Sequence, residues 1–397
     1  MNMSSTTRGK LILAAGVALF AIGQSLLFII IAPLAPKTGL TEIQFGTIFG
    51  LANIPLIFTA PMWGKLSDTH GRKPIFIIGL FGSAIGTILV ALALEYGLSG
   101  SSTVVTVAIY LFLARAFYSS TAAAIYPSSN AYIADITERS DRAQGMALIG
   151  GANSLGSMLG PAIGGGLAFV GLLFPMYVAA FVMTAGGIWA IFSLTEPKKH
   201  VSQNNKVNIK FTDKRLRPFM IAWGVFFLVF ISLQFITAYY IRDVFGYTDP
   251  ADQMRIASIA LASMAIIITV VQGVIFQIFR PHPRTLLRLF GPSFVIALLI
   301  IALAPNIYLL IFGYSLIGIS FAFGTPGING GLSLCVEAHE QGTAAGILAA
   351  GGTIGPILGP ALGPMLFSLS PTAPMLFGAV TFTFISFYMF SVKIPEA

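Results

Sequence analysis

The sequence predicts an all-α membrane protein with twelve transmembrane helices, arranged as two six-helix bundles related by a pseudo-two-fold. First, 56% of the 397 residues are hydrophobic and only 9% are charged. A soluble domain carries about 25% charged residues, so lipid must cover much of this surface. Second, apolar runs of the ~20 residues that cross a bilayer as a helix recur along the chain. Third, the second half repeats motifs of the first.

The predicted spans are separated by turn-forming residues or by short charged segments. The N-terminal segment carries Arg8 and Lys10 before an apolar run, as a signal peptide does. That run is long and lacks a small-residue cleavage site, so it is expected to be the first span. The twelve spans are 11–33, 42–62, 75–95, 104–132, 143–169, 173–194, 218–241, 255–279, 287–304, 307–334, 343–369 and 373–391.

Basic residues predict the orientation of the spans. If the N-terminus is inside, the inside segments hold eighteen Lys and Arg residues and the outside loops hold only Lys37, Arg242 and Arg255. Because cytoplasmic loops are rich in Lys and Arg, both termini are expected to be cytoplasmic. The default location is a bacterial inner (plasma) membrane, with the chain crossing it many times.

A polar segment divides the chain into an N-terminal bundle, 1–194, a cytoplasmic linker, 195–217, and a C-terminal bundle, 218–397. The basic linker enforces topology or, alternatively, binds anionic lipid headgroups. The pattern G-x-x-x-G-P-A-x-G begins at Gly156 and again at Gly355, 199 residues later. A parallel duplication of six spans is a known layout of transporters.

The segment GKLSDTHGRKP, residues 64–74, concentrates charge and glycine between two apolar spans. We expect a loop in which Gly64 allows close helix approach and Gly71 adopts a positive φ. Asp68 is expected either to lie against a helix N-terminus or to accept a hydrogen bond from Arg72, which Lys73 follows, and Asp135 is expected to be a second acceptor for Arg72. The alternative is a plain positive-inside loop. A weaker copy at 273–283 has Gln277 where Asp68 stands, so this arrangement of charges is predicted only for the first half.

Arg115 is the one charge deep in a predicted span, and an unpaired charge there is costly. It is expected to bind cargo or couple transport, or else to be a structural arginine tied to backbone carbonyls. Neutral polar residues in other spans would complete a cavity suited to an anionic or zwitterionic cargo, unless they only bond to neighbouring helices. They are Gln24, Asn53, Tyr118, Tyr126, Asn153, Gln234, Tyr239, Gln272 and Asn329.

Small residues in spans five and eleven follow the spacing that allows tight helix contact, and their prolines permit bending. The alternatives are packing alone or gating as well. The residues are Gly156, Gly160, Pro161 and Gly164 in span five, and Gly355, Gly359, Pro360 and Gly363 in span eleven.

These motifs resemble those of the major facilitator superfamily. Residues 64–74 resemble its loop signature, Arg115 resembles its fourth-helix arginine, and the span-five set around Pro161 resembles the signature of its drug:proton antiporters. Residues 131–137, AYIADIT, are similar to the tetracycline-efflux branch. The resemblance implies the major facilitator fold, a charge relay that latches the cytoplasmic side, gating by span five, and proton-coupled export.

Other function classes have little support. The single Cys335 and the four scattered histidines predict no metal site, and no catalytic constellation or nucleotide loop is present. The net charge of +8 follows topology, so no nucleic-acid partner is expected. We expect a monomeric exporter in the lipid bilayer, with no cofactor, that moves a small-molecule substrate such as a siderophore, metabolite or drug. The alternative is an importer or facilitator of organic anions or sugars.

None of the fourteen acids lies in the middle of a predicted span. This disfavours a cationic drug as cargo, and it disfavours proton coupling through a central carboxylate. The groups expected to titrate during proton antiport are instead near the span ends: Asp135, Asp68, Glu337 or Glu95.

Overall fold

The structure is a computed structural model of the 397-residue chain. It describes residues 5–100, 103–137, 142–167, 170–197, 212–279, 281–337 and 340–392. These residues form helices and their connections, and no strand occurs among them. The chain divides into two compact units, Met1–Gln203 (unit 1) and Asn204–Ala397 (unit 2). The division falls within the predicted linker, 195–217, of which residues 198–211 lie outside the described part.

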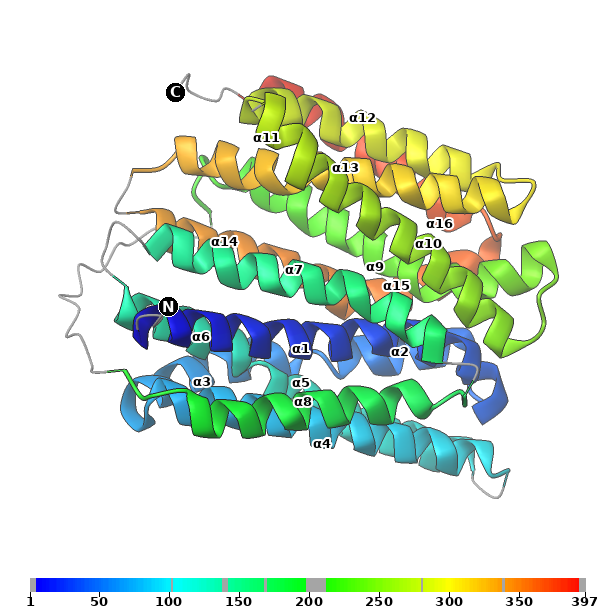
Figure 1. The fold of residues 1–397 in the computed structure, drawn as a ribbon. Coiled ribbons are helices and arrows are strands. Elements are labelled where there is room, and N and C mark those ends of the chain that lie inside the picture. The colour runs from blue at the N-terminus through cyan, green and yellow to red at the C-terminus, as the bar shows by residue number, and fades with distance from the viewer. Residues whose placement is uncertain are drawn as a thin grey trace. The chain divides into compact units, whose positions relative to one another are not determined.

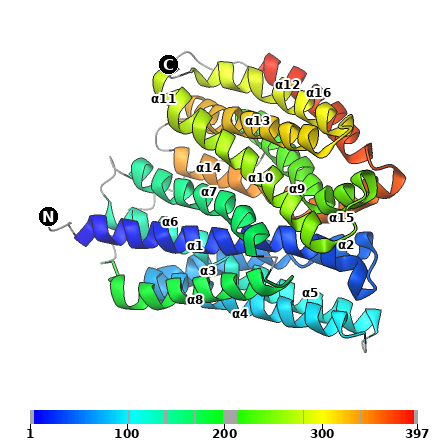
Figure 2. The ribbon, with the colours of Figure 1, turned by 45° about the vertical axis from the view of Figure 1, so that its right-hand side comes forward.

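Unit 1 is a bundle of helices that lie roughly along one direction (Figure 1). α1 packs against α7 and α8, and α4 packs against α5 and α8 (Figure 2). The elements are α1 (Ser5–Leu34), the 3-10 helix η1 (Ala35–Thr38), α2 (Glu42–Leu51), α3 (Pro55–His70), α4 (Arg72–Leu98), α5 (Val104–Ala122), α6 (Ile125–Ile136), α7 (Arg142–Leu167) and α8 (Phe174–Ser193).

Unit 2 is a second helical bundle, with an aromatic core. The ring of Phe226 lies 5.2 Å from that of Phe290 and 4.9 Å from that of Phe294. The elements are α9 (Arg217–Phe245), α10 (Pro250–Val270), the π-helical turn η2 (Val271–Ile275), α11 (Phe276–Phe279), α12 (Pro283–Ala302), α13 (Ile307–Leu334), α14 (Gln341–Gly352), α15 (Ile354–Leu369) and α16 (Ala373–Ser391).

Eleven helical segments of the described chain are long and apolar enough to cross a membrane. They correspond to eleven of the twelve predicted spans. The remaining span, 143–169, corresponds to α7, whose 26 residues extend about 39 Å at 1.5 Å per residue. The chain is therefore a multi-pass membrane protein.

Four spans that the sequence predicts as continuous are interrupted. Proline accounts for three of the breaks, because Pro55, Pro127 and Pro356 each lack the N–H that would bond the carbonyl four residues earlier. The fourth interruption is a π-helical turn, a feature that is frequent at functional sites. The breaks lie between α2 and α3, between α5 and α6, between α14 and α15, and at η2.

The predicted glycine repeat forms a tight helix contact in each unit. In unit 1, a Cβ on Gly160 would lie 2.6 Å from the carbonyl oxygen of Ile22 on α1. In unit 2, a Cβ on Gly363 would lie 2.5 Å from the carbonyl oxygen of Ser232 on α9. The repeat thus brings α7 against α1 and α15 against α9 at backbone contact. Its role in gating stays a prediction.

Gly160→Ala is expected to lower the stability of unit 1. The added methyl group meets the backbone of α1, and overpacking of this kind costs about 1–3 kcal/mol. Gly166→Ala is the matched control on the same helix, because nothing lies within 4 Å of its added Cβ. Thermal unfolding of the detergent-purified protein measures the stability of both variants. Equal midpoints for the two variants would contradict the packing role of Gly160.

Candidate functional site

The predicted loop 64–74 is almost entirely helical, which corrects the sequence prediction. α3 continues to His70 and α4 begins at Arg72, so Gly71 alone forms the junction. The side chains of Ser67 and Thr69 bond to carbonyls of the preceding turn and extend α3. Gly71 has φ +104°, as the sequence predicts, and its ψ of 155° places it in a region that is essentially restricted to glycine.

Arg72 lies between two carboxylates at this junction. Its guanidinium is 2.5 Å from Asp68 on α3 and 3.0 Å from Asp135 near the end of α6. It also donates to the Ser67 hydroxyl at 2.7 Å. Both predicted contacts are present, and one arginine therefore ties together the ends of three helices. That these contacts act as a relay stays a prediction.

Glu196, just after α8, completes this cluster, and the sequence analysis missed it. Its carboxylate accepts the backbone N–H groups of Arg72 at 2.6 Å and Lys73 at 3.0 Å. A carboxylate at a helix N-terminus satisfies free donors and the helix dipole. The sequence held one signal of this role, an acid directly after a predicted span. Gly71 has no side chain with which to cap α4, so an acid from elsewhere in the chain can do so.

Lys73 connects the segment to another helix, whereas Gly64 is not closely packed. Lys73 donates through Nζ to the carbonyl of Ile191 on α8 at 2.6 Å, which strengthens the α4–α8 contact. Gly64 does not need to be glycine for close packing, because an added Cβ would meet its nearest atom, on Pro127, at 3.9 Å. The expectation that Gly64 permits close helix approach is therefore wrong.

Glu196→Gln is expected to destabilise unit 1 by about 1 kcal/mol, the usual loss on weakening a helix N-terminal cap. The amide keeps one acceptor oxygen but loses the charge. Glu95→Gln is the control, because among the described residues its carboxylate accepts from the Tyr177 hydroxyl at 2.7 Å and an amide oxygen can do the same. Thermal unfolding should separate the two, and a Glu196→Gln midpoint no lower than that of Glu95→Gln would contradict the capping role.

Arg115, on α5, is the centre of a buried polar cluster. Its residue exposure is 3%. The guanidinium stacks over the Tyr118 ring at 4.6 Å and the Phe49 ring at 5.5 Å. Asn53 accepts from the Ser119 hydroxyl at 2.8 Å and lies 3.5 Å from Nη2 of Arg115. The cluster therefore joins α5 to the α2–α3 break, where Asn53 lies.

The cluster leaves donors unused. Within the described residues, Nε and Nη1 of Arg115 and the hydroxyl of Tyr118 have no hydrogen-bond partner, and Arg115 has no carboxylate partner. A buried unpaired cation costs several kcal/mol, because water no longer solvates it. The unused Nε–H and Nη1–H groups lie on either side of Nη2, and each can donate a charge-assisted hydrogen bond to an oxygen of a carboxylate or phosphate. The arrangement is thus suited to an anionic group.

The other predicted polar residues of the spans form separate, mostly local contacts. Tyr126 donates to Asn153 and so bonds α6 to α7, and the ring of Phe20 meets that of Tyr126 edge-on. Gln24 and Gln234 are half-buried. In unit 2, Gln272 on η2 bonds the Ala322 carbonyl, Asn329 bonds its own helix at Thr325, and Tyr239 lies under the Arg242 guanidinium.

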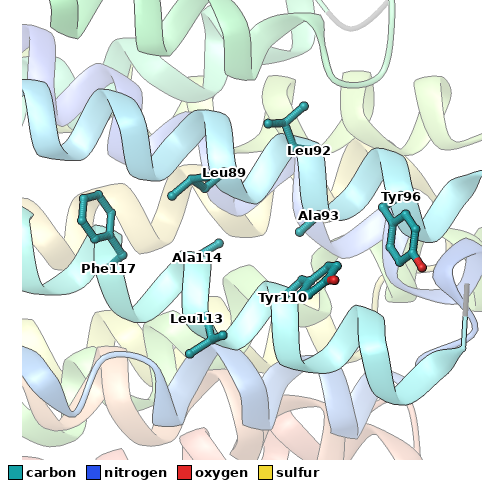
Figure 3. A pocket seen from close by; sticks show the side chains of 8 residues that line it. All are labelled: Leu89, Leu92, Ala93, Tyr96, Tyr110, Leu113, Ala114 and Phe117. Atoms are coloured by element: carbon teal, nitrogen blue, oxygen red, sulfur yellow. The ribbon is translucent and has the colours of Figure 1, made fainter.

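Two apolar grooves flank α5, and neither contains a predicted site residue. One, of 440 Å³, lies between α4 and α5, with Phe117 at one end and the paired rings of Tyr96 and Tyr110 at the other (Figure 3). The second, of 510 Å³, lies between α2 and α5 and is lined by residues such as Ile43 and Phe112. They lack charged side chains and so differ from the Arg115 cluster.

No group of three His, Cys, Asp or Glu side chains in the described part of the chain is placed to hold a metal ion. The two bundles of membrane-spanning helices, with a buried arginine beside broken helices, define instead a multi-pass membrane transporter. The chain belongs to the Major Facilitator Superfamily, whose sequence model matches residues 13–302. It is therefore a transporter of small molecules and not an enzyme.

Relatives agree with this assignment. The chain is 26% identical over 83% of its length to Multidrug resistance protein 1 of Bacillus subtilis (strain 168), covering 82% of that protein. It is 27% identical over 83% of its length to the class G tetracycline resistance protein of Vibrio anguillarum, again covering 82% of it. A solved bacterial homologue of the human lysosomal transporter Spinster matches 98% of this chain and 97% of its own, with TM-score 0.74 and 15% identity.

Proposed function

We propose that this protein is a secondary-active exporter of small amphipathic molecules that carry a carboxylate or similar anionic group. The cargo is an anion or zwitterion of the siderophore, metabolite or drug kind, and proton antiport drives its export by alternating access. The observation that carries the proposal is the buried Arg115 guanidinium, which has unused donors and no carboxylate partner in the described chain. A cargo carboxylate would supply the missing charge.

The relatives support export. Their names are those of multidrug and tetracycline resistance proteins, and resistance by a membrane transporter requires outward movement of the compound. The close contact of α7 with α1 at the glycine–proline motif supports the same branch of the family. The proposed unit is a monomer that uses the proton gradient and no bound cofactor.

The distribution of charge supports cytoplasmic termini and an inner-membrane location. In unit 1, Glu196 and Asp135 meet the α3–α4 junction, so the ends of α3, α6 and α8 lie together with Arg72 and Lys73. In unit 2, Arg215 precedes α9 at the contact with Glu340, which precedes α14. The positive-inside rule places basic ends of this kind in the cytoplasm.

The Arg72 cluster is the proposed latch of the transport cycle. Its two ion pairs fix the ends of α3, α4 and α6 in one arrangement, and loss of either pair would weaken it. Asp68 is the more exposed of the two side chains, at 62% against 14% for Asp135, so its ion pair is the more accessible to water.

The second candidate function is import or facilitated passage of organic anions or sugars on the same fold. The Arg115 cluster also suits an organic anion, so only the direction and the energy coupling distinguish the two functions. Neither the relatives' resistance names nor the α7 motif supports import.

Transport in proteoliposomes tests the proposal. Purified protein in liposomes receives carboxyfluorescein at equal concentrations on both sides, followed by a pH step of about 2 units. Export by proton antiport predicts net movement of the dye toward the acidic compartment against its own growing gradient. Equilibration without accumulation would favour a facilitator, and movement that ignores the pH step would overturn proton antiport. Protein-free liposomes provide the background rate.

A further inference from the structure

The two halves of predicted span eleven pack very differently against α9. On α15, a Cβ added to Gly355 or Gly363 would lie 2.5–2.6 Å from backbone atoms of α9. On α14, an added Cβ meets nothing within 4 Å at Gly346 and only ordinary contacts of 3.4–3.5 Å at Gly351 and Gly352. α15 is therefore fixed to α9 at backbone contact along its length. Among the described glycines, α14 approaches α9 this closely near its hinge end, where a Cβ added to Gly224 of α9 would lie 2.9 Å from the carbonyl oxygen of Gly351, and its N-terminal part shows no such contact.

The junction between these halves is a natural hinge. α14 ends at Gly352, Thr353 lies between the two helices, and α15 begins at Ile354. Pro356 cannot donate to the carbonyl of Gly352, so one backbone hydrogen bond across the junction is lost. Few bonds thus resist a change in the angle between α14 and α15.

The Arg215 side chain connects the N-terminal end of α14 to the start of α9. Arg215 forms a two-pronged contact with Glu340, the residue before α14, with Nη1 at 2.8 Å and Nη2 at 3.0 Å from its carboxylate oxygens. Glu340 also accepts the backbone N–H of Glu337 at 3.0 Å. Two-pronged pairs of this kind are directional and stronger than single contacts.

Asp213 holds the arginine in position for this contact. Its carboxylate accepts Nη2 of Arg215 at 2.9 Å and the Arg215 backbone N–H at 2.9 Å. The hydrogen bonds from Arg215 lower the pKa of Asp213, so this carboxylate stays ionised through the neutral range. Beside the arginine lies a hollow of 430 Å³, lined also by Lys214 and Tyr388, which gives the guanidinium room to move once released.

We infer that α14 is the moving half of a hinged helix, and that Arg215 and Glu340 are positioning residues that hold its free end against α9. The inference rests on the proposed alternating-access transport, in which the bundles must rearrange. Breaking the pair would let α14 swing about Thr353 while α15 stays fixed. The second half thus has an arginine–carboxylate latch of its own, at positions different from those of the Arg72 cluster, although the sequence predicts a latch only in the first half.

Hydrogen–deuterium exchange of the full-length protein in detergent tests the inference without requiring transport. Glu340→Gln is expected to raise exchange of the amides in 341–352 by about tenfold, with no change in 354–369. Asp243→Asn, which breaks the Arg242–Asp243 pair near the other end of α9, is the matched control and should leave 341–352 unchanged. Unchanged exchange in 341–352 for Glu340→Gln, or an equal rise in both halves, would overturn the inference.

A cross-link tests whether the motion belongs to the transport cycle. Cysteines replace Arg215 and Glu340 in a Cys335→Ser background, and a bifunctional maleimide joins them in proteoliposomes. The inference predicts that the cross-linked protein has low exchange in 341–352 and moves less than one-tenth as much carboxyfluorescein as the unlinked protein. Full transport by the cross-linked protein would overturn the inference. Failure of the proposed function would differ, because then neither form would transport and the exchange result would stand alone.

Discussion

Arg115→Ala should abolish transport of anionic cargo while the protein remains folded. Hydrogen bonds to a charged group contribute about 1.5–3 kcal/mol, which corresponds to about a 10- to 150-fold loss of cargo affinity. The buried guanidinium has free Nε and Nη1 donors, so removing it takes away the proposed partner of the cargo. Binding of carboxyfluorescein to the purified variant, together with transport in proteoliposomes, measures the loss.

Two companion variants separate a binding role from a structural role. Arg115→Lys keeps the charge but loses the fixed planar arrangement of the guanidinium donors, so it should recover part of the affinity. Arg115→Met fills a similar volume without charge, and replacing an unpaired buried cation in this way should leave the unfolding midpoint unchanged or raise it. If Arg115→Met instead unfolds at a clearly lower temperature and Arg115→Ala still binds cargo, the arginine is structural.

Gly71→Ala should produce the largest defect in the Arg72 cluster. Its backbone, at φ +104° and ψ 155°, costs a residue with a side chain about 1–3 kcal/mol. The added Cβ would also lie 2.8 Å from Oε1 of Glu196, the carboxylate that accepts two backbone N–H groups of α4. Both effects displace Arg72, so we expect a transport rate at least about tenfold lower and a lower unfolding midpoint.

Gly64→Ala is the control for that prediction. Gly64 belongs to the same segment, and there is space for a Cβ at this position. It should match the wild type in stability and transport. The transport rate at fixed pH and thermal unfolding should be measured for both variants. Equal behaviour of the two would mean that neither the positive φ of Gly71 nor the Glu196 contact matters for the cycle.

The fold was largely predictable because its signals are compositional and local. Apolar run length predicts spans, and the glycine repeat at 156 and 355 predicts tight contacts, which the structure places on α1 and α9. Breaks within spans were not predicted, because apolar runs continue through Pro55, Pro127 and Pro356. The extension of α3 through residues 64–70 was missed because charged residues near a membrane surface are equally compatible with a helix or a loop.

The candidate site was only partly predictable. Arg72, Asp68 and Asp135 carry complementary charges at recognisable positions, so their pairing was expected. The roles of Glu196 and Glu340 depend on contacts across 124 and 125 positions of the sequence, which no local pattern encodes. Arg115 was singled out by its charge within a predicted span and by its resemblance to the family's fourth-helix arginine. Its aromatic neighbours and free donors become visible only when α5 meets the α2–α3 break.

The charge preference of the cargo site tests the central claim most directly. Carboxyfluorescein and rhodamine 6G share a xanthene ring system and carry opposite charges. Equilibrium binding of each dye to the purified wild type and to Arg115→Met should be measured at one ionic strength. The account predicts that the wild type prefers the anionic dye by at least about tenfold and that Arg115→Met loses this preference. Tighter binding of the cationic dye by the wild type, with no change in Arg115→Met, would contradict it.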